Sequence, residues 1–400
     1  MNLARITVGT PRRMTQTQNI PPQHPLKGVV VVELGHSVAA PFAGKILADL
    51  GATVIKIEKP ETGDDTRAWG PPFWHDESVT FGVYNGNKHS AAIDIKDKAQ
   101  CAALREFITT KADVVVQNMR AGLLKSFDLD DSLCDASARL IYCNMAAFGS
   151  KGPLVSKPGY DPMMQAFGGI MSITGEEGRP PVRVGPSIVD MSTGMWAVIG
   201  ILAALQRRHA TGQGCVVDTS LYESTLCWIG SAASNYLATG ERPKRRGTEM
   251  PFLVPYKIFE ASDGYLLIAA GNDNLFRRLA STVGHTEWLE DARFNTNPGR
   301  VGNKDFVNAS VQAIIATQTR AHWSELFERE RVPSAILQSI DEVLEHPQTR
   351  ALEMLQTTPD GRKQFMGTPL AFDGVRGQME RAPPDLGADT QMVLGQKDEA

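Results

Sequence analysis

The sequence predicts an α/β fold in which a parallel sheet is covered by helices on both faces. Through the first half of the chain, apolar segments rich in β-branched residues alternate with segments of helical spacing. This alternation is typical of parallel sheets, whose strands are joined by crossover helices. After residue 240 the alternation stops, which indicates a second, smaller unit. The chain has 400 residues, which is enough for both.

The first strand is predicted at 28–34, where GVVVVEL is a continuous apolar run like those of strands buried on both faces. A helix is expected at 41–52, where the pattern ends at a glycine. A second helix is expected at 97–112, with Asp97 near its start. Further strands are expected at 53–58, 90–95, 113–118 and 140–145.

The second half of the chain has a different residue pattern, without the regular alternation of strands and helices. Residues 240–251, GERPKRRGTEMP, have the composition of a basic linker, and 263–271 predicts a strand entered from a turn. Residues 273–330 are expected to be mainly helical, and 332–347 returns to a strand followed by a helix. We therefore divide the chain into a leader at 1–24, a large domain at 25–220, a small domain at 221–330 and a return to the large domain at 331–400.

Composition excludes several classes of function. The formal charge is −4, and no basic tract is interleaved with aromatics, so we expect no nucleic-acid partner. The longest apolar stretch, 195–205, is shorter than the roughly 18–20 residues that span a bilayer, so we expect no membrane span. The five cysteines form no CxxC and the eight histidines no HxxxH or HExxH, so we expect neither a disulfide framework nor a metal site.

Residues 1–24 contain three arginines and no acidic residue, and they end at a PPQHP sequence. This composition favours a disordered leader or an expression scar. Because the amphipathic pattern is poor, an organellar transit peptide is the weaker alternative. We expect a cytoplasmic protein, or one of the mitochondrial matrix if the leader is a transit peptide.

The turn after the first predicted strand argues against a nicotinamide cofactor. A dinucleotide site shows GxGxxG at this place, whereas the sequence here is LGHSVAAPFAG, in which only Gly35 is suitably placed. A P-loop is also absent. Polar residues nevertheless follow the predicted strands, and cations there could surround an anionic ligand, although each alone is ordinary loop chemistry. They are His36, Ser37, Lys59, Lys96, Asn118 and Arg120.

Asp190 stands at the start of a long apolar helical pattern, in the sequence GPSIVDMSTGMW. Asp is among the favoured helix caps, so a purely structural role is the ordinary interpretation. A carboxylate held at a helix start could equally act as a nucleophile. The spacing of residues around Asp190 does not by itself decide between a helix cap and a nucleophile.

Several long segments, in order, resemble the family III CoA-transferases, also called the CaiB/BaiF family, over about residues 25–395. These segments are PLKGVVVVELGHSVAAPFAGKILADLGATVIKIEKPETGDDTRAWGPPF, NGNKHSAAIDIKD, ADVVVQNMRAG, PGYDPMMQAFGGIMSITGE and DMSTGMWAVIGILAALQRRHATGQGCVVD. Within the family, GDDTRAWGPPF, RRGT and AAGND are most similar to the succinate–hydroxymethylglutarate CoA-transferases. The resemblance implies a Rossmann-like large domain, a small α+β domain and an interlocked homodimer. It implies CoA or acyl-CoA as substrate and no permanently bound cofactor.

The resemblance also implies site residues. The family's catalytic aspartate falls on Asp190. Its CoA contacts fall on His36, Ser37, Val38, Lys59, Ile93, Lys96, Asn118 and Met119, and we add Arg120 and Lys125 as further candidates. Departures from the formyl-CoA:oxalate branch, at Val38, at Ser126 and in the small-domain loop, argue against oxalate and for a bulkier acceptor.

A 2-methylacyl-CoA racemase of the same fold is the alternative function. Those enzymes use a histidine in a GHD motif as one of two bases, whereas this chain has Tyr160 in GYD. A phenol with a pKa of about 10 is a poor proton shuttle at neutral pH. Tyr160 therefore favours the transferase.

The predicted chemistry has Asp190 attack a donor thioester and pass through an aspartyl-CoA thioester before an acceptor acid takes the CoA. Backbone N–H groups at Gly168–Gly169 and at 192–194 are candidates to stabilise the oxyanion, at about 3 kcal/mol per donor. Tyr160 and Asp161 are expected in the substrate pocket. Arg67 and Trp69 are expected to meet the distal carboxylate of a dicarboxylic acid.

Overall fold

The computed structural model describes residues 24–395, and their main feature is a six-stranded sheet in which every strand is parallel to its neighbours. The strand order is β5-β2-β1-β6-β7-β8, so the chain builds outward from β1 in one direction and then, from β6, in the other. This is the order of doubly wound nucleotide-binding sheets, and it makes β1 and β6 the switch point. The strands are β1 (Val30–Leu34), β2 (Thr53–Glu58), β5 (His89–Ala92), β6 (Val114–Gln117), β7 (Ile141–Ala146) and β8 (Val216–Ser220).

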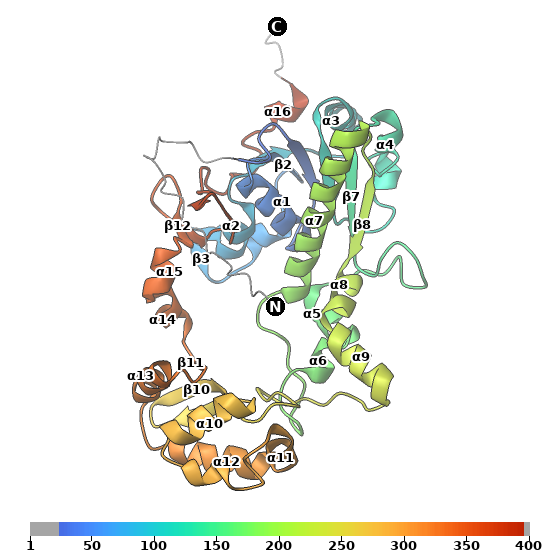
Figure 1. The fold of residues 1–400 in the computed structure, drawn as a ribbon. Coiled ribbons are helices and arrows are strands. Elements are labelled where there is room, and N and C mark those ends of the chain that lie inside the picture. The colour runs from blue at the N-terminus through green and yellow to red at the C-terminus, as the bar shows by residue number, and fades with distance from the viewer. Residues whose placement is uncertain (1–23, 396–400) are drawn as a thin grey trace, which may run out of the picture.

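Helices cover both faces of this sheet, as predicted (Figure 1). On one face, α1 (Ala39–Asp49) and α7 (Ile188–Thr211) pack on alternate residues of the strands, such as Val114 and Val116. The intervening Val115 faces the opposite core. That second core includes residues of α3 (Lys98–Lys111), α4 (Leu133–Ala136) and α16 (Gln391–Leu394).

The five strands predicted from apolar runs are confirmed to within about three residues, and the cap of α3 is the predicted Asp97, which accepts from the N–H groups of Ala99 and Gln100. The edge strand β8 was not predicted. Its sequence, VVDTS, is short and half exposed, so it lacks the continuous apolar run that marked the central strands.

Helix α7 is longer than the apolar stretch seen in the sequence, and its 24 residues are long and apolar enough to cross a bilayer by length and composition. Half of its most apolar window is buried inside the protein, and it packs against α1, β7, β8 and α8. A core helix of a folded domain has these same properties, so the finding carries little weight for a membrane.

A separate cluster of buried side chains, drawn from 254–332, forms the lower lobe in Figure 1. Its antiparallel sheet has the order β11-β10-β9, with β9 (Tyr256–Ala261), β10 (Gly264–Ala269) and β11 (Ser334–Ile336). The fully buried Arg300 donates to the carbonyls of Val254, Phe294 and Gly271, which ties three loops together. The helices of this lobe are α10 (Asp273–Thr282), η3 (Thr286–Leu289), α11 (Asn297–Gly302), α12 (Lys304–Ile315) and α13 (Arg320–Glu330).

Several of the remaining elements pack with the parallel sheet. Leu221, the first residue of α8, belongs to the core beneath α7, so this part of 221–330 packs with the parallel sheet. The other elements are η1 (Asp65–Ala68), β3 (Phe73–Trp74), β4 (Glu77–Ser78), α2 (Val79–Asn85), η2 (Leu124–Phe127), α5 (Asp161–Phe167), α6 (Ile170–Ile173), α8 (Leu221–Trp228), α9 (Gly230–Thr239), α14 (Ile340–Glu345), α15 (Pro347–Ala351), β12 (Leu355–Thr357), β13 (Gln364–Met366), β14 (Ala371–Phe372) and β15 (Val375–Arg376). The predicted leader falls on 1–23, outside the described residues, apart from His24.

Candidate active site

A cavity of about 590 Å³ opens at the carboxyl ends of the strands, as expected for a sheet with this order. Gly35 and His36 line it from the end of β1, and Asn118 lines it from the end of β6. It extends past the ends of β7 and β8 to Tyr160, so it reaches the residue that precedes α5.

The cavity gathers some of the residues predicted to contact CoA and leaves others outside. Those that line it are His36, Lys59, Asn118, Met119, Arg120 and Lys125. Ser37 and Val38 lie in the same turn but are not part of the lining, and Ile93 is buried in the core beside β2. Lys96 is exposed in the turn before α3, also outside the lining.

Asn118 is held in a structural contact. Its Oδ1 accepts from the backbone N–H of His36 at 3.0 Å, and its Nδ2 donates to the carbonyl of His36 at 2.9 Å. The amide therefore fixes the turn between β1 and α1 from both sides. Ser37, in the same turn, has φ 69, a left-handed conformation that costs energy in a residue with a Cβ.

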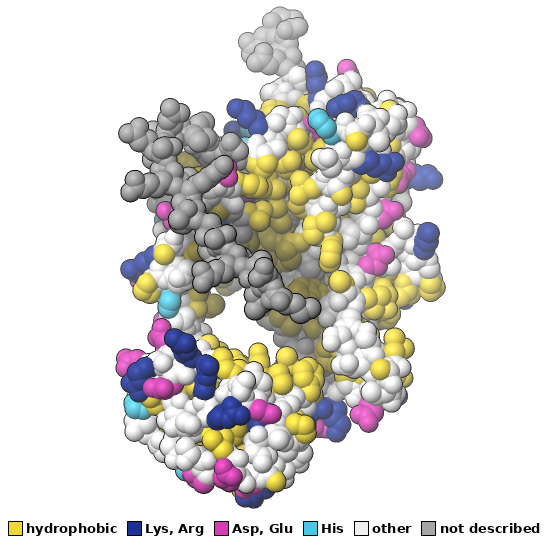
Figure 2. All heavy atoms as spheres, viewed as in Figure 1, with side chains coloured by type: hydrophobic (Ala, Val, Ile, Leu, Met, Phe, Trp, Pro, Cys, Tyr) yellow, Lys and Arg dark blue, Asp and Glu magenta, His cyan; other side chains and the backbone are white. Residues whose placement is uncertain are grey.

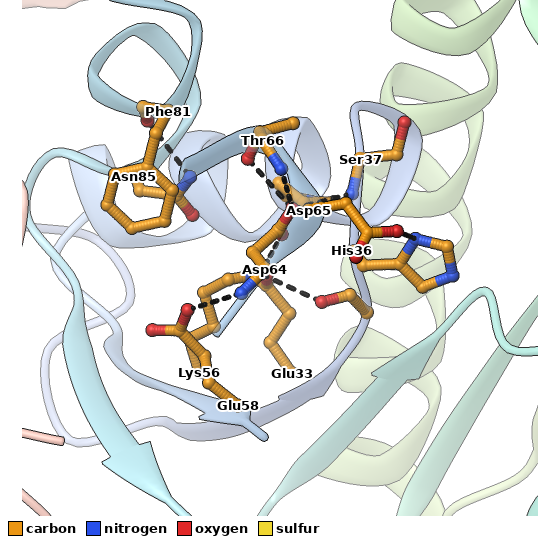
Figure 3. Close-up of polar contacts among 12 residues, drawn as sticks. Glu33, His36, Ser37, Lys56, Glu58, Asp64, Asp65, Thr66, Phe81 and Asn85 are labelled. Atoms are coloured by element: carbon orange, nitrogen blue, oxygen red, sulfur yellow. Dashed lines mark hydrogen bonds and ion pairs between the residues drawn. The ribbon is translucent and has the colours of Figure 1, made fainter. Parts of the chain in front are cut away.

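Asp64 is the anchor that holds this strained turn, and the sequence analysis did not identify it. Its Oδ1 accepts from the N–H of Ser37 at 3.1 Å and from the N–H of Thr66 at 2.9 Å, and its Oδ2 pairs with Lys56 Nζ at 2.7 Å (Figure 3). Burial alone would raise the pKa of Asp64, but Lys56 and these hydrogen bonds outweigh it and lower the pKa to about 2. The signal for this role was the GDDTR run, in which an Asp precedes a Thr by two residues.

Lys56 is fully buried and links Asp64 to the sheet. Its Nζ lies 2.8 Å from Glu33 Oε1 and donates to the carbonyl of Gly35 at 2.8 Å. Burial opposes its charge, but Glu33 and Asp64 raise its pKa. Lys88, also fully buried, pairs with the other oxygen of Glu33 at 2.7 Å. The turn that lines the cavity is thus supported by a compensated set of buried charges.

Burial lowers the pKa of His36 despite the nearby carboxylates of Asp64 and Asp65, which favours the neutral imidazole. Its Nδ1 is buried and has no hydrogen-bond partner among the described residues, and it lies 4.0 Å from Asp65 Oδ2. The residue itself is part of the cavity lining.

The position of Arg67 does not fit the predicted contact with a substrate carboxylate. Its Nε and Nη2 each lie 2.8 Å from an oxygen of Glu58, and Nη2 also donates to the carbonyl of Pro384. The guanidinium lies over the ring of Phe81 and does not line the cavity. The guanidinium of Arg67 is thus already engaged in a bidentate contact with the carboxylate of Glu58. Trp69 is 42% exposed and also lies outside the lining.

Asp190 is not the cap of α7. It lies in the first turn, three residues after the cap position Ser187, whose side chain makes no capping hydrogen bond. The cap is supplied from α5: Asp161 Oδ2 accepts from the N–H of Val189 at 2.7 Å and of Asp190 at 3.3 Å. The capping role considered for Asp190 therefore belongs to Asp161, which is 2% exposed.

Asp190 as a residue is 9% exposed, and its carboxylate takes part in no hydrogen bond with the described residues. Burial, and then the negative charge of Asp161, raise its pKa to about 7. The two carboxylates also raise the pKa of Tyr84, after burial, which places this α2 side chain near them. Neither Asp190 nor Asp161 lines the cavity, although Tyr160, directly before Asp161, does.

Most of the predicted oxyanion donors are already occupied. The N–H of Gly168 donates to the carbonyl of Met164, and 192–194 lie inside α7, where N–H groups bond one turn back. The N–H groups at the start of α7 are taken by Pro186 and Asp161. Among the described residues of the predicted set, only Gly169 has an N–H without a backbone acceptor.

Comparison with known proteins gives a consistent result. Residues 26–390 match the family model described as CoA-transferase family III. The chain is 37% identical to the succinate–glutarate CoA-transferase of Agrobacterium fabrum, covering 96% of this chain and 98% of that one. It is 36% identical to the acetyl-CoA:oxalate CoA-transferase of Acetobacter aceti, with 92% and 94% covered. A crystal structure of a CaiB/BaiF family protein from Brucella suis superposes with a TM-score of 0.83 at 36% identity, covering 92% of this chain and 98% of that one.

Proposed function

The chain belongs to CoA-transferase family III and is a CoA-transferase, and we propose that it works through a covalent thioester between CoA and the Asp190 carboxylate. The observation that carries this proposal is the state of Asp190. It is a nearly buried carboxylate with no hydrogen bond from the described residues, and a second carboxylate is fixed beside it. A carboxylate that is poorly solvated in this way is a stronger nucleophile than one in water.

The proposed reaction exchanges carboxylate and thiolate four times, without water. Asp190 attacks the acyl carbon of the donor thioester and CoA leaves as thiolate, which gives a mixed anhydride. The thiolate attacks the Asp190 carbonyl, which releases the donor acid and forms the aspartyl-CoA thioester. The acceptor carboxylate displaces CoA from Asp190 to form a second anhydride. The thiolate then attacks the acceptor acyl carbon, which gives the new thioester and frees Asp190.

CoA is proposed to bind in the cavity at the carboxyl ends of the strands. Lys59, Arg120 and Lys125 are exposed cations on its lining and are suited to the phosphate groups of CoA. His36, whose pKa is lowered by burial, is part of the same lining. Tyr160, next to Asp161, is part of the same lining, so we place the thioester end of the ligand near Tyr160 and its phosphates at the cations.

The donor is proposed to be succinyl-CoA or a similar thioester, and the acceptor a carboxylic or dicarboxylic acid. Relatives of similar identity are named for glutarate and for oxalate, so identity alone does not separate these acceptors. Arg67 is held by Glu58, so the distal carboxylate of a dicarboxylic acid needs another partner in this chain.

The racemase alternative receives no support from the comparisons reported above, which name CoA-transferases. Tyr160 stands in place of the racemase histidine and is 56% exposed at the cavity. When the protein is incubated with a 2-methylacyl-CoA in deuterated water, we expect no deuterium to be incorporated at the α-carbon.

The assembled protein is proposed to be a homodimer with the domain limits 25–220, 221–330 and 331–400, and to be cytoplasmic. Exposed apolar side chains support the dimer: Figure 2 shows hydrophobic side chains gathered down the middle of one face, over α7. Trp196 and Ile199 on α7 are 44% and 54% exposed, and Leu237 on α9 is 82% exposed. Monomeric proteins rarely expose large contiguous apolar patches, which are typical of interaction surfaces.

The test is to incubate the protein with succinyl-CoA and a panel of mono- and dicarboxylic acids, and to identify new thioesters by mass spectrometry. The proposal predicts a new CoA thioester with at least one dicarboxylic acid of four to six carbons. Exchange that occurs equally well with Asp190→Asn would contradict the role of Asp190. Absence of any product across the panel would contradict the choice of donor.

A further inference from the structure

Gln165 is a buried amide close to Asp161, and it is not among the predicted site residues. Gln165 is on α5 and has no exposed surface. It lies one helical turn after Asp161, so the two side chains share a face of α5. It lines no part of the cavity.

Both ends of the Gln165 amide are engaged. Its Nε2 donates to Asp161 Oδ1 at 2.6 Å, and its Oε1 accepts from the N–H of Val184 at 2.8 Å. Since the backbone N–H can only donate and the carboxylate can only accept, the orientation of the amide is determined. Val184 lies in the segment that leads into α7.

Asp161 therefore has both oxygens fixed. Oδ1 is held by Gln165, and Oδ2 accepts from the first turn of α7, at Val189 and Asp190. Without Gln165, Asp161 could rotate about its side-chain bonds and leave two N–H groups of α7 without an acceptor. The entry segment at Val184 would lose its tie to α5 at the same time.

We infer that Gln165 is a positioning residue that acts through Asp161 to fix the start of α7 and the carboxylate of Asp190. The inference rests on the proposed function, since it assigns Gln165 a role in the reaction of Asp190. Gln165 touches neither the cavity nor the Asp190 carboxylate, so it contributes to turnover rather than to binding of the CoA thioester.

Two variants separate this role from a general contribution to folding. Gln165→Met keeps the approximate volume and removes both hydrogen bonds. In Gln165→Glu, the protonated acid donates to Asp161 and accepts from Val184, as the amide does, whereas the ionised form repels Asp161. The charged groups on the helices packed here are Asp161 on α5 itself, Asp190 on α7 and Glu223 on α8, while α6 has none. These three acids favour the protonated form, and the exposed Arg183, which donates to the carbonyl of Val184, opposes them.

The experiment measures kcat, KM for succinyl-CoA and thermal stability of the full chain between pH 6 and pH 8. We expect Gln165→Met to lower kcat about tenfold or more, with KM within about twofold, because misplacing a reacting group has effects of this size. We also expect the rise of kcat with pH (the acid limb of the profile) to occur at lower pH in Gln165→Met. The reason is that the negative charge of Asp161 is no longer fixed close to the Asp190 carboxylate. Gln165→Glu should keep more than half of the wild-type kcat at pH 6.

Gln356→Met is the matched control, since Gln356 is also a buried amide whose Nε2 donates to a carbonyl, that of Gly377, and it lies in β12. A folded Gln165→Met with wild-type kcat and acid limb would overturn the inference, as would Gln165→Glu being as slow as Gln165→Met at pH 6. If Gln165→Met does not fold, Gln165→Glu at pH 6 decides alone. Failure of the proposed function is seen separately, as retained activity in Asp190→Asn.

Discussion

At the scale of single residues, the central contrast is between two aspartates 29 positions apart in the sequence. Asp161 has both oxygens in hydrogen bonds, whereas the Asp190 carboxylate has none from the described residues. An aspartate at a helix start looks like a cap in the sequence, and here the cap comes from another helix. Since that contact is tertiary, no local spacing rule could have assigned it.

The raised pKa of Asp190 predicts the pH dependence of transfer. The nucleophile must be ionised, so kcat should rise with pH through about 7 and level off near pH 8. In Asp161→Asn the neighbouring charge is gone, and the acid limb should move to lower pH, although burial, the larger cause, still holds the pKa above its ordinary value. The check is a kcat profile of both proteins; an unchanged limb in Asp161→Asn would mean that the two carboxylates do not interact.

The same pKa predicts that Asp190 destabilises the fold at neutral pH. Its folded-state pKa of about 7 exceeds the ordinary 3.8, so the folded state holds a proton that the unfolded chain has lost between these values. The free energy of unfolding therefore falls as pH rises toward 7. Asp190→Asn should be more stable than wild type, by a margin that grows by at most about 3 kcal/mol between pH 5 and pH 8. Urea unfolding at both pH values measures this; a constant margin would contradict it.

At the scale of elements, the turn from β1 to α1 depends on residues from two other parts of the chain. Asn118, at the end of β6, clamps His36, and Asp64, at the cap of η1, holds the left-handed Ser37. The sequence indicated that polar residues follow the strands and therefore meet at one edge of the sheet. It could not show that Asn118 is used to hold the protein together, because its partner His36 is 82 residues away in the sequence. Arg67 pairs with Glu58, nine residues earlier, and no spacing rule for a helix or a strand gives that contact.

Asp64 should matter for both stability and binding. Asp64→Ala leaves Lys56 buried without one of its two carboxylate partners and frees the Ser37 turn, so we expect a loss of about 3–5 kcal/mol. Asp64→Asn keeps an oxygen for the N–H groups of Ser37 and Thr66 and should lose less. If both variants fold, KM for the CoA thioester should rise more in Asp64→Ala than in Asp64→Asn. In both variants kcat should change less than KM. Equal losses in the two variants would contradict the anchoring role of the Oδ1 contacts.

At the scale of the whole molecule, the alternation of strands and helices was enough to predict the parallel sheet. The central strands are buried on both faces, so their sequences carry a continuous apolar signal. Strands β8 and β9 were not predicted. Strand β8 is a half-exposed edge strand, and β9 follows closely after a segment with the composition of a linker. The pairing of β8 with β7 joins residues that are far apart in the sequence, which local patterns do not contain. Strand β9 instead pairs with β10, the next strand in the chain, across a short turn.

The exposed apolar surface predicts a dimer in solution. Sedimentation equilibrium should give twice the 43.5 kDa mass of one chain. Ile199→Glu, which places a charge on the exposed face of α7, should lower the yield of dimer or its stability, whereas Glu325→Lys, on α13, should not. A stable wild-type monomer with full transferase activity would contradict this.

If Asp190 carries CoA during turnover, the CoA adduct can be found on its peptide by mass spectrometry. The protein is mixed with succinyl-CoA, quenched in acid and digested, and the peptide that contains Asp190 is compared with that from Asp190→Asn. We expect a fraction of the wild-type peptide to have CoA attached at Asp190, a label that a dicarboxylic acceptor acid removes, and no such adduct in Asp190→Asn. A wild-type protein that transfers CoA rapidly with no adduct on Asp190, or with an adduct on another residue, would contradict it.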